Sequence, residues 1–212
     1  RYGLPKKLDQ KKWLLSDGKL AKENRAKGVR RGLAATTLLM AIPGAIYLYN
    51  GEELGLPEVA DLPTEVLQDP IWERNLHSDK GRDGCRVPLP WNKSGSSFGF
   101  GENGAHLPQP NWFGNYSVEM QENNPNSVLT VYRRALELRK ELQTEEELKW
   151  IKTKSKKVLH FSRPNGWNCI TNFTSKNYPM PKGEVLFSSA PLVTKKKEKT
   201  LIPAGTTVWF KN

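Results

Sequence analysis

The spacing of apolar residues changes about two thirds of the way along the chain. Between Leu20 and Ala41 the residues become small and apolar, which predicts a helix whose later part enters a core. From Val128 to Leu142 apolar residues recur on a helical period with Arg and Glu between them, which predicts an amphipathic helix. Beyond this helix the period becomes two, in short runs at 148–151, 158–163, 167–173, 185–188, 199–202 and 206–210. Turn residues separate these runs, and this regular spacing predicts an antiparallel β-sandwich.

A buried strand is predicted directly after the first helix. Pro43 and Gly44 end the helix, because proline lacks the N–H that would continue it. The run from Ala45 to Tyr49 is apolar and aromatic, a pattern typical of a strand buried on both faces. Asn50, Glu52 and Glu53 follow at once. Ligand sites of parallel α/β folds lie at the carboxyl ends of strands, so these polar groups are predicted to face a site.

The region from Glu52 to Pro125 lacks a sustained period and is rich in Pro, Gly, Asn and Trp. We expect a long irregular segment with no more than short helical turns. Loops of this length in a compact domain are usually functional.

Composition limits the class of partner and cofactor. The 212 residues carry a net charge of +11, but the basic clusters are short and are not interleaved with aromatic residues as a nucleic-acid platform would be. No apolar run is long enough to cross a membrane. Cys85 and Cys169 are predicted to be free thiols of a cytoplasmic protein. The three histidines lie apart, so the sequence predicts no metal site, and nothing in it indicates a cofactor.

Three segments carry a resemblance to a known family. The run Pro-Gly-Ala-Ile-Tyr-Leu-Tyr-Asn-Gly-Glu-Glu at 43–53 resembles the last barrel strand of α-glucosidases of glycoside hydrolase family 13. The segment Arg-Asp-Gly-Cys-Arg-Val-Pro-Leu-Pro-Trp at 82–91 resembles the family's Arg-Asp-x-x-Arg-x-Pro-x-x-Trp segment. The start, Arg-Tyr-Gly-Leu-Pro, resembles the residues after its Asn-His-Asp motif.

This resemblance implies a fold of class α/β plus all-β. Residues 1–145 would form the C-terminal end of a (β/α)8 barrel, with its last helices and eighth strand, and residues 146–212 a β-sandwich domain. It also implies a retaining α-glucosidase that removes terminal α-linked glucose from oligosaccharides or disaccharides. The Asn-His-Asp, nucleophile and acid/base motifs do not occur in the chain. No catalytic residue is therefore expected here, and the chain alone is predicted to be inactive without the missing N-terminal part of the barrel.

Four residues are predicted to contact substrate. The resemblance implies that Arg86 hydrogen-bonds the terminal sugar, whose hydroxyls suit the donors of a guanidinium group. The alternative is that Arg86 holds its loop by pairing with Asp83 or Glu52. Glu52 and Glu53 are candidates to accept sugar hydroxyls, and Glu52 is preferred. Asn50 stands where the family usually has Gln, so its reach is shorter.

The sequence leaves two further functions open. A non-catalytic carbohydrate-binding β-domain would place Trp150, Trp167 and Trp209 on one exposed face. A basic protein that binds nucleic acid is the least favoured alternative, and no nucleic acid or membrane is expected as a partner.

Overall fold

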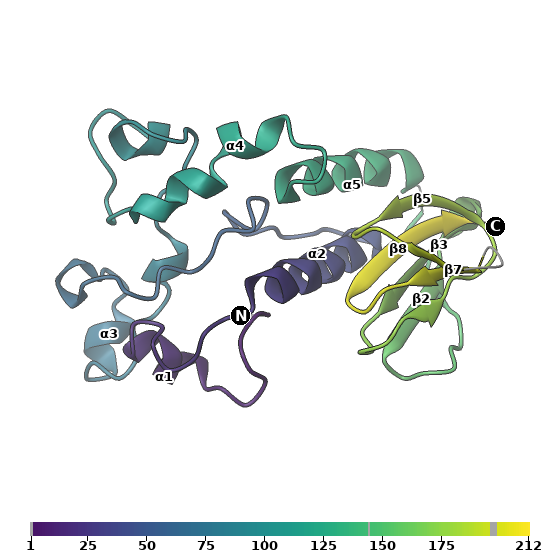
Figure 1. Ribbon diagram of the computed structural model, residues 1–212, viewed down its shortest axis with the longest axis horizontal. Coiled ribbons are helices and arrows are strands. Elements are labelled where there is room, and N and C mark those ends of the chain that lie inside the picture. Colours follow the sequence, from purple (N-terminus) through teal and green to yellow (C-terminus); the bar gives the residue numbers. More distant parts are fainter. Residues whose placement is uncertain (1, 144, 196–198) are drawn as a thin grey trace. The chain divides into compact units, whose positions relative to one another are not determined.

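The computed structural model describes residues 2–143, 145–195 and 199–212. The chain divides into two compact units (Figure 1). The first comprises the residues up to Gly28 together with Leu48–Thr130, and the second comprises Val29–Tyr47 and Val131–Asn212. Two helices, α2 (Arg25–Ala41) and α5 (Val128–Leu142), each contribute to both units.

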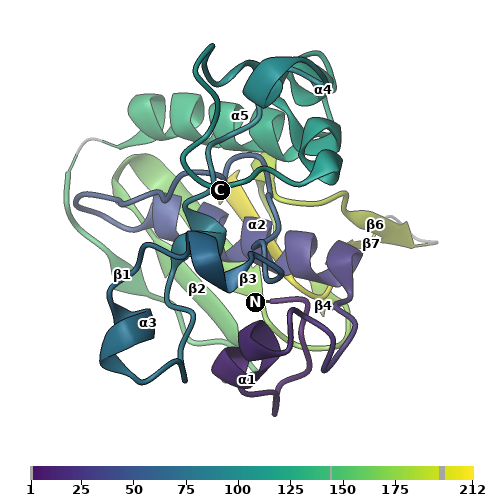
Figure 2. The ribbon, with the colours of Figure 1, turned by 90° about the vertical axis from the view of Figure 1, so that its left-hand side faces the viewer.

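The second unit contains two antiparallel sheets. One has the strand order β1-β2-β3-β8-β5 and the other has the order β4-β7-β6. Figure 2 shows β6 and β7 extending away from the other strands. The strands are β1 (Lys149–Trp150), β2 (Val158–Ser162), β3 (Trp167–Asn172), β4 (Tyr178–Pro179), β5 (Glu184–Ser188), β6 (Val193–Lys195), β7 (Lys199–Ile202) and β8 (Thr206–Lys211).

Strand β8 shows how the alternation of side chains builds this unit. Val208 and Phe210 belong to a core cluster that also contains residues of β2, β3 and β7. Thr207 and Trp209 point to the opposite face, because successive side chains of a strand alternate. There the Thr207 hydroxyl donates to the carbonyl of Ala34 at 2.7 Å, and Trp209 Nε1 donates to the carbonyl of Thr37 at 3.2 Å. One face of the larger sheet therefore packs against α2, while the other face packs against the smaller sheet.

The two long helices contact each other within the second unit. The hydroxyl oxygens of Thr36 on α2 and Tyr132 on α5 lie 2.9 Å apart. Helix α5 has the bounds that the sequence predicts, whereas α2 begins at Arg25 rather than Leu20.

The first unit is built from short helices and loops, as the sequence predicts for 52–125. Its helices are α1 (Gln10–Leu15), α3 (Ile71–Arg74) and α4 (Val118–Glu122), with 3₁₀ turns η1 (Thr64–Val66), η2 (Asp83–Cys85), η3 (Ser96–Gly99) and η4 (Asn111–Tyr116). One further 3₁₀ turn, η5 (Pro164–Gly166), lies in the second unit. Apolar residues scattered along the loops, among them Val59, Val87 and Phe113, gather in one buried cluster of the unit. Trp13 and Leu14 of α1 form a second cluster with Ala60.

The predicted strand from Ala45 to Tyr49 is not formed. In the part of the chain that the structure describes, no strand pairs with this segment, and Tyr47 is 93% exposed. A β-strand forms when its N–H and C=O groups bond to neighbouring strands, so the sequence pattern alone does not make one. The prediction of a buried, paired strand in this segment is wrong for the described residues.

The aromatic face of a carbohydrate-binding β-domain is also absent. Trp167 and Trp209 are 2% and 0% exposed, and only Trp150 of the three predicted residues is open to solvent, at 63%. Within the described residues, no helix is both long and apolar enough to cross a membrane. The predicted division of the chain at residues 145 and 146 stays a prediction.

Candidate functional site

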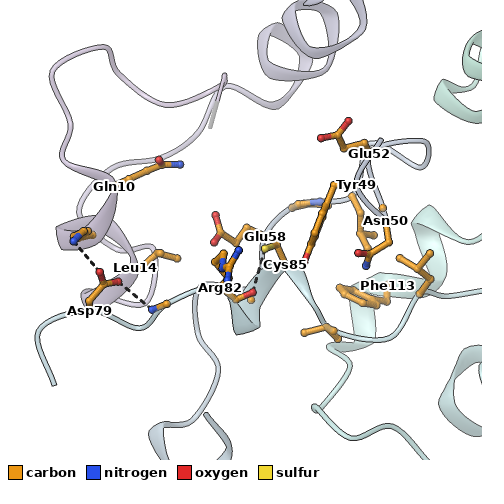
Figure 3. A pocket seen from close by; sticks show the side chains of 18 residues that line it. Gln10, Leu14, Tyr49, Asn50, Glu52, Glu58, Asp79, Arg82, Cys85 and Phe113 are labelled. Atoms are coloured by element: carbon orange, nitrogen blue, oxygen red, sulfur yellow. Dashed lines mark hydrogen bonds and ion pairs between the residues drawn. The ribbon is translucent and has the colours of Figure 1, made fainter. Parts of the chain in front are cut away.

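A cavity of about 530 Å³ lies in the first unit, at the turn that follows Tyr49 (Figure 3). Its wall combines four parts of the sequence: helix α1, the segment from Tyr49 to Glu58, the segment from Asp79 to Leu89, and Phe113 of η4. Asn50 and Glu52 line it, together with Tyr49, Cys85 and Phe113. The cavity thus carries carboxylate, amide and hydroxyl groups beside an aromatic ring, a mixture suited to a polar ligand.

The turn at Gly51 separates the two predicted glutamates. Gly51 has a φ of 90°, a conformation that favours glycine, and its N–H donates to Glu53 Oε2 at 2.8 Å. The Glu53 side chain is therefore folded back onto the turn. The side chain of Glu52 is exposed and lines the cavity. Partial loss of hydration and the nearby Glu53 carboxylate both raise the pKa of Glu52.

Arg86 lies beside the cavity rather than in its wall. Its Nη1 is 3.2 Å from Asp69 Oδ2 and 3.6 Å from Asp83 Oδ1. The pKa of Arg86 is raised, most of all by a hydrogen bond with the Tyr49 side chain. The negative charges of Asp69 and Asp83 raise it further. Tyr49 lines the cavity and so joins Arg86 to it. The ion pair between Arg86 and Asp83, which was the alternative expected from the sequence, is therefore present. Arg86 also pairs with Asp69, which the sequence did not predict.

The two residues before Gly84 in this motif, Arg82 and Asp83, have different partners. Arg82 Nε lies 3.8 Å from Asp69 Oδ2. Asp83 instead accepts hydrogen bonds from the backbone N–H groups of Gln68 and Asp69. The 3₁₀ turn η2 buries the Asp83 side chain, which directs its carboxylate toward this backbone.

Asp69 is the functional candidate that sequence reasoning missed. Its carboxylate accepts hydrogen bonds from Arg82 and Arg86, which lie 13 and 17 positions later in the chain. The available indication was local: Asp69 precedes Pro70 and accepts from the N–H of Ile71, two positions later, as aspartates do in Asx turns. That pattern predicts a turn and says nothing of a distant arginine.

The motif also contains a thiol, Cys85, and an aromatic ring, Trp91. Cys85 Sγ donates to the carbonyl of Arg82 at 3.1 Å, and burial raises the pKa of this thiol. Trp91 is half exposed. Within the described residues, no three His, Cys, Asp or Glu side chains gather as metal ligands.

Comparison with known proteins gives the family. A family model described as the α-amylase catalytic domain matches residues 16–147. A probable α-glucosidase of Rhizobium meliloti is 36% identical over 159 residues, covering 71% of this chain and 28% of that protein. An oligo-1,6-glucosidase of Parageobacillus thermoglucosidasius is 29% identical over 123 residues, covering 50% of this chain and 22% of that protein.

A solved structure agrees with the sequence matches. The α-glucosyl transfer enzyme XgtA superimposes with a TM-score of 0.69 at 28% identity, over 92% of this chain and 36% of that one. The fold is therefore confirmed as part of a barrel enzyme of this family followed by its antiparallel β-domain. The chain spans about a quarter of the length of the curated relatives named above. The cavity and the Arg86 segment accordingly lie in a chain that belongs to the α-amylase family of glycoside hydrolases.

Proposed function

We propose that this chain is the C-terminal part of a retaining α-glucosidase that releases terminal α-linked glucose from oligosaccharides or disaccharides. Membership of the α-amylase family supports this proposal, as do the relatives named α-glucosidase and oligo-1,6-glucosidase. Two free cysteines support a cytoplasmic location.

The observation that carries the proposal is Arg86 anchored beside a polar cavity. Two carboxylates and Tyr49 hold the guanidinium group, whose planar array of five N–H donors suits the hydroxyls of a sugar. Asn50 and Glu52 supply an amide and hydrogen-bond acceptors from the cavity wall. Glu53 supports the turn that presents them. In this proposal Arg86, Glu52 and Asn50 bind a sugar directly or through water, and none of them is a reacting group.

The reaction needs groups that we place in the missing part of the barrel. A retaining glycosidase uses two carboxyl groups roughly 5 Å apart, one as nucleophile and the other as acid and then base. The nucleophile attacks the anomeric carbon as the acid protonates the departing oxygen. Water then releases glucose with the original anomeric configuration. In this proposal the 212-residue chain contributes sugar contacts but neither reacting carboxyl group, so by itself it should not hydrolyse a glucoside.

Hydrolysis of p-nitrophenyl α-glucoside tests the proposal, with the whole protein and the 212-residue chain assayed separately. We expect activity from the whole protein alone, with α-glucose as the first product seen by NMR. Arg86→Lys keeps the charge but loses the planar array of donors, so KM should rise about tenfold, which corresponds to one good hydrogen bond. Arg134→Lys, an exposed change on α5, is the matched control. Activity of the isolated chain, or β-glucose as the first product, would contradict the proposal.

A further inference from the structure

We propose that Asp69 is the positioning residue that sets the orientation of the Arg86 guanidinium group for sugar binding. This inference rests on the proposed function, because it assigns to Asp69 a role in the same site. Asp69 is placed to act through Arg86 and is not expected to touch the substrate.

The Asp69 carboxylate is shared among four hydrogen-bond and charge partners. Oδ2 accepts from Arg86 Nη1 at 3.2 Å and from the backbone N–H of Arg82 at 3.2 Å, and it lies 3.8 Å from Arg82 Nε. Oδ1 accepts from the N–H of Ile71 at 3.1 Å. The side chain is only 11% exposed. Both oxygens are thus engaged, which fixes the carboxylate plane and, with it, the direction in which Nη1 points.

Asp83 holds the backbone that carries Asp69. Its Oδ2 accepts from the N–H of Gln68 at 2.6 Å and from the N–H of Asp69 at 2.8 Å, and its side chain is 2% exposed. The other oxygen, Oδ1, lies 3.6 Å from Arg86 Nη1. Asp83 therefore supports Arg86 mainly by fixing the segment at 68–69, whereas Asp69 makes the shorter contact with the guanidinium group.

The electrostatics of this cluster keep Asp69 charged. The N–H of Ile71 stabilises the carboxylate most, followed by the N–H of Arg82 and the charges of both arginines, and together they lower the pKa of Asp69. An ionised Asp69 offsets part of the charge of Arg82 and Arg86. The contacts of Arg86 with the two carboxylates are made by Nη1. A guanidinium group has five N–H donors on three nitrogens, so this arrangement leaves donors on the other nitrogens for a sugar.

The test measures KM and kcat of the whole enzyme for p-nitrophenyl α-glucoside. Asp69→Asn keeps the size of the side chain but removes its charge and one acceptor oxygen. We expect KM to rise about tenfold, the factor expected for loss of one good hydrogen bond, with a smaller change in kcat. Asp69→Glu keeps the charge and should recover part of the loss. Asp61→Asn, an exposed change in the same unit, is the matched control and should leave KM unchanged.

A double-mutant cycle separates positioning from general support of the loop. If Asp69 acts through Arg86, adding Asp69→Asn to Arg86→Lys should raise KM by much less than the product of the two single effects. Independent effects that multiply would overturn the proposal, as would an unchanged KM in Asp69→Asn when Arg86→Lys is impaired.

A second readout does not depend on activity. NMR signals of the Arg86 side chain should show slower hydrogen exchange in the wild-type protein than in Asp69→Asn, because the ion pair shields the group. An inactive whole enzyme would refute the proposed function, and unchanged exchange of Arg86 would refute the positioning by Asp69. The two failures are therefore distinguishable.

Discussion

The Lys80 ammonium group lies 2.8 Å from the Asp17 carboxylate, although 63 positions separate them in the sequence. Lys80 also donates to the carbonyl of Ala60 at 3.1 Å and to that of Leu62 at 3.2 Å. Its side chain is 8% exposed, and that of Asp17 is 39% exposed. An ammonium group has three N–H donors, so three acceptors satisfy it fully. One lysine thus connects three segments of the unit that holds the cavity.

Replacing Lys80 by Met should loosen these segments. Methionine has a similar length, but it removes the donor of two carbonyls and of Asp17 Oδ1, while Asp17 Oδ2 keeps its contact with Lys19. The free energy of unfolding of this unit should fall by about 1–3 kcal/mol, the usual cost of buried polar groups left unpaired. Hydrogen exchange of the backbone amides around Ala60 and Leu62 should become faster in the variant.

Lys11→Met is the control for this change. Lys11 also pairs with an aspartate, Asp79, at 2.8 Å, but its side chain is largely exposed, and exposed ion pairs contribute little. Equal exchange rates in the two variants would show that the buried contacts of Lys80 do not stabilise these segments more than an exposed ion pair does.

Arg139→Lys should destabilise the end of α2. Arg139 on α5 donates to the carbonyls of Ile42 at 2.9 Å and Gly44 at 2.6 Å, and also to that of Met40. The last carbonyls of a helix lack partners within the helix, and one ammonium group cannot replace the spread of a guanidinium group. The free energy of unfolding should fall by about 1–3 kcal/mol. Thermal unfolding of Arg139→Lys and of the exposed control Arg134→Lys measures it, and equal melting temperatures would exclude this capping role.

Much of the fold could be predicted because its pattern is local. The helical period from Val128 to Leu142 gave the bounds of α5, and alternation located β2, β3 and β8. Strand β4 was missed because it has only two residues, one of them Pro179, and β6 because it has three. The prediction of a strand from Ala45 to Tyr49 was wrong for another reason. A strand forms only when neighbouring strands bond to it, and a local sequence pattern does not show whether such strands are present.

The candidate site could be predicted only where its residues are close together in the sequence. Asn50 and Glu52 lie directly after an apolar run, and both line the cavity. The pairing of Arg86 with Asp69 joins two points of an irregular loop. No periodicity relates such positions, so their contact required the folded structure. The roles of all four predicted substrate contacts stay predictions.

Glu52→Gln should stabilise the first unit at neutral pH. The pKa of Glu52 is raised in the folded protein, so the folded state disfavours its ionised form relative to the unfolded state. This penalty exists above the folded pKa and disappears below the unfolded pKa, which is about 4.3 for a glutamate. The melting temperature of Glu52→Gln should therefore exceed that of the wild type at pH 7 and equal it near pH 3.5. Glu65→Gln, an exposed change, is the control, and a gain that persists at pH 3.5 would exclude the charge as its cause.

The two thiols should differ in their reaction with a thiol reagent. Cys85 is half buried in the cavity wall, whereas Cys169 is fully buried in β3, opposite Phe161 of β2 and Trp209 of β8. Burial raises the pKa of both thiols, so neither should react fast at pH 7. In the native protein, mass spectrometry should find slow labelling at Cys85 alone, and Cys85→Ser should abolish it. In denaturant both thiols should react. Labelling of Cys169 at the rate of Cys85 would mean that the β-sandwich opens as readily as the cavity wall, against the close packing of the strands on either side of Cys169.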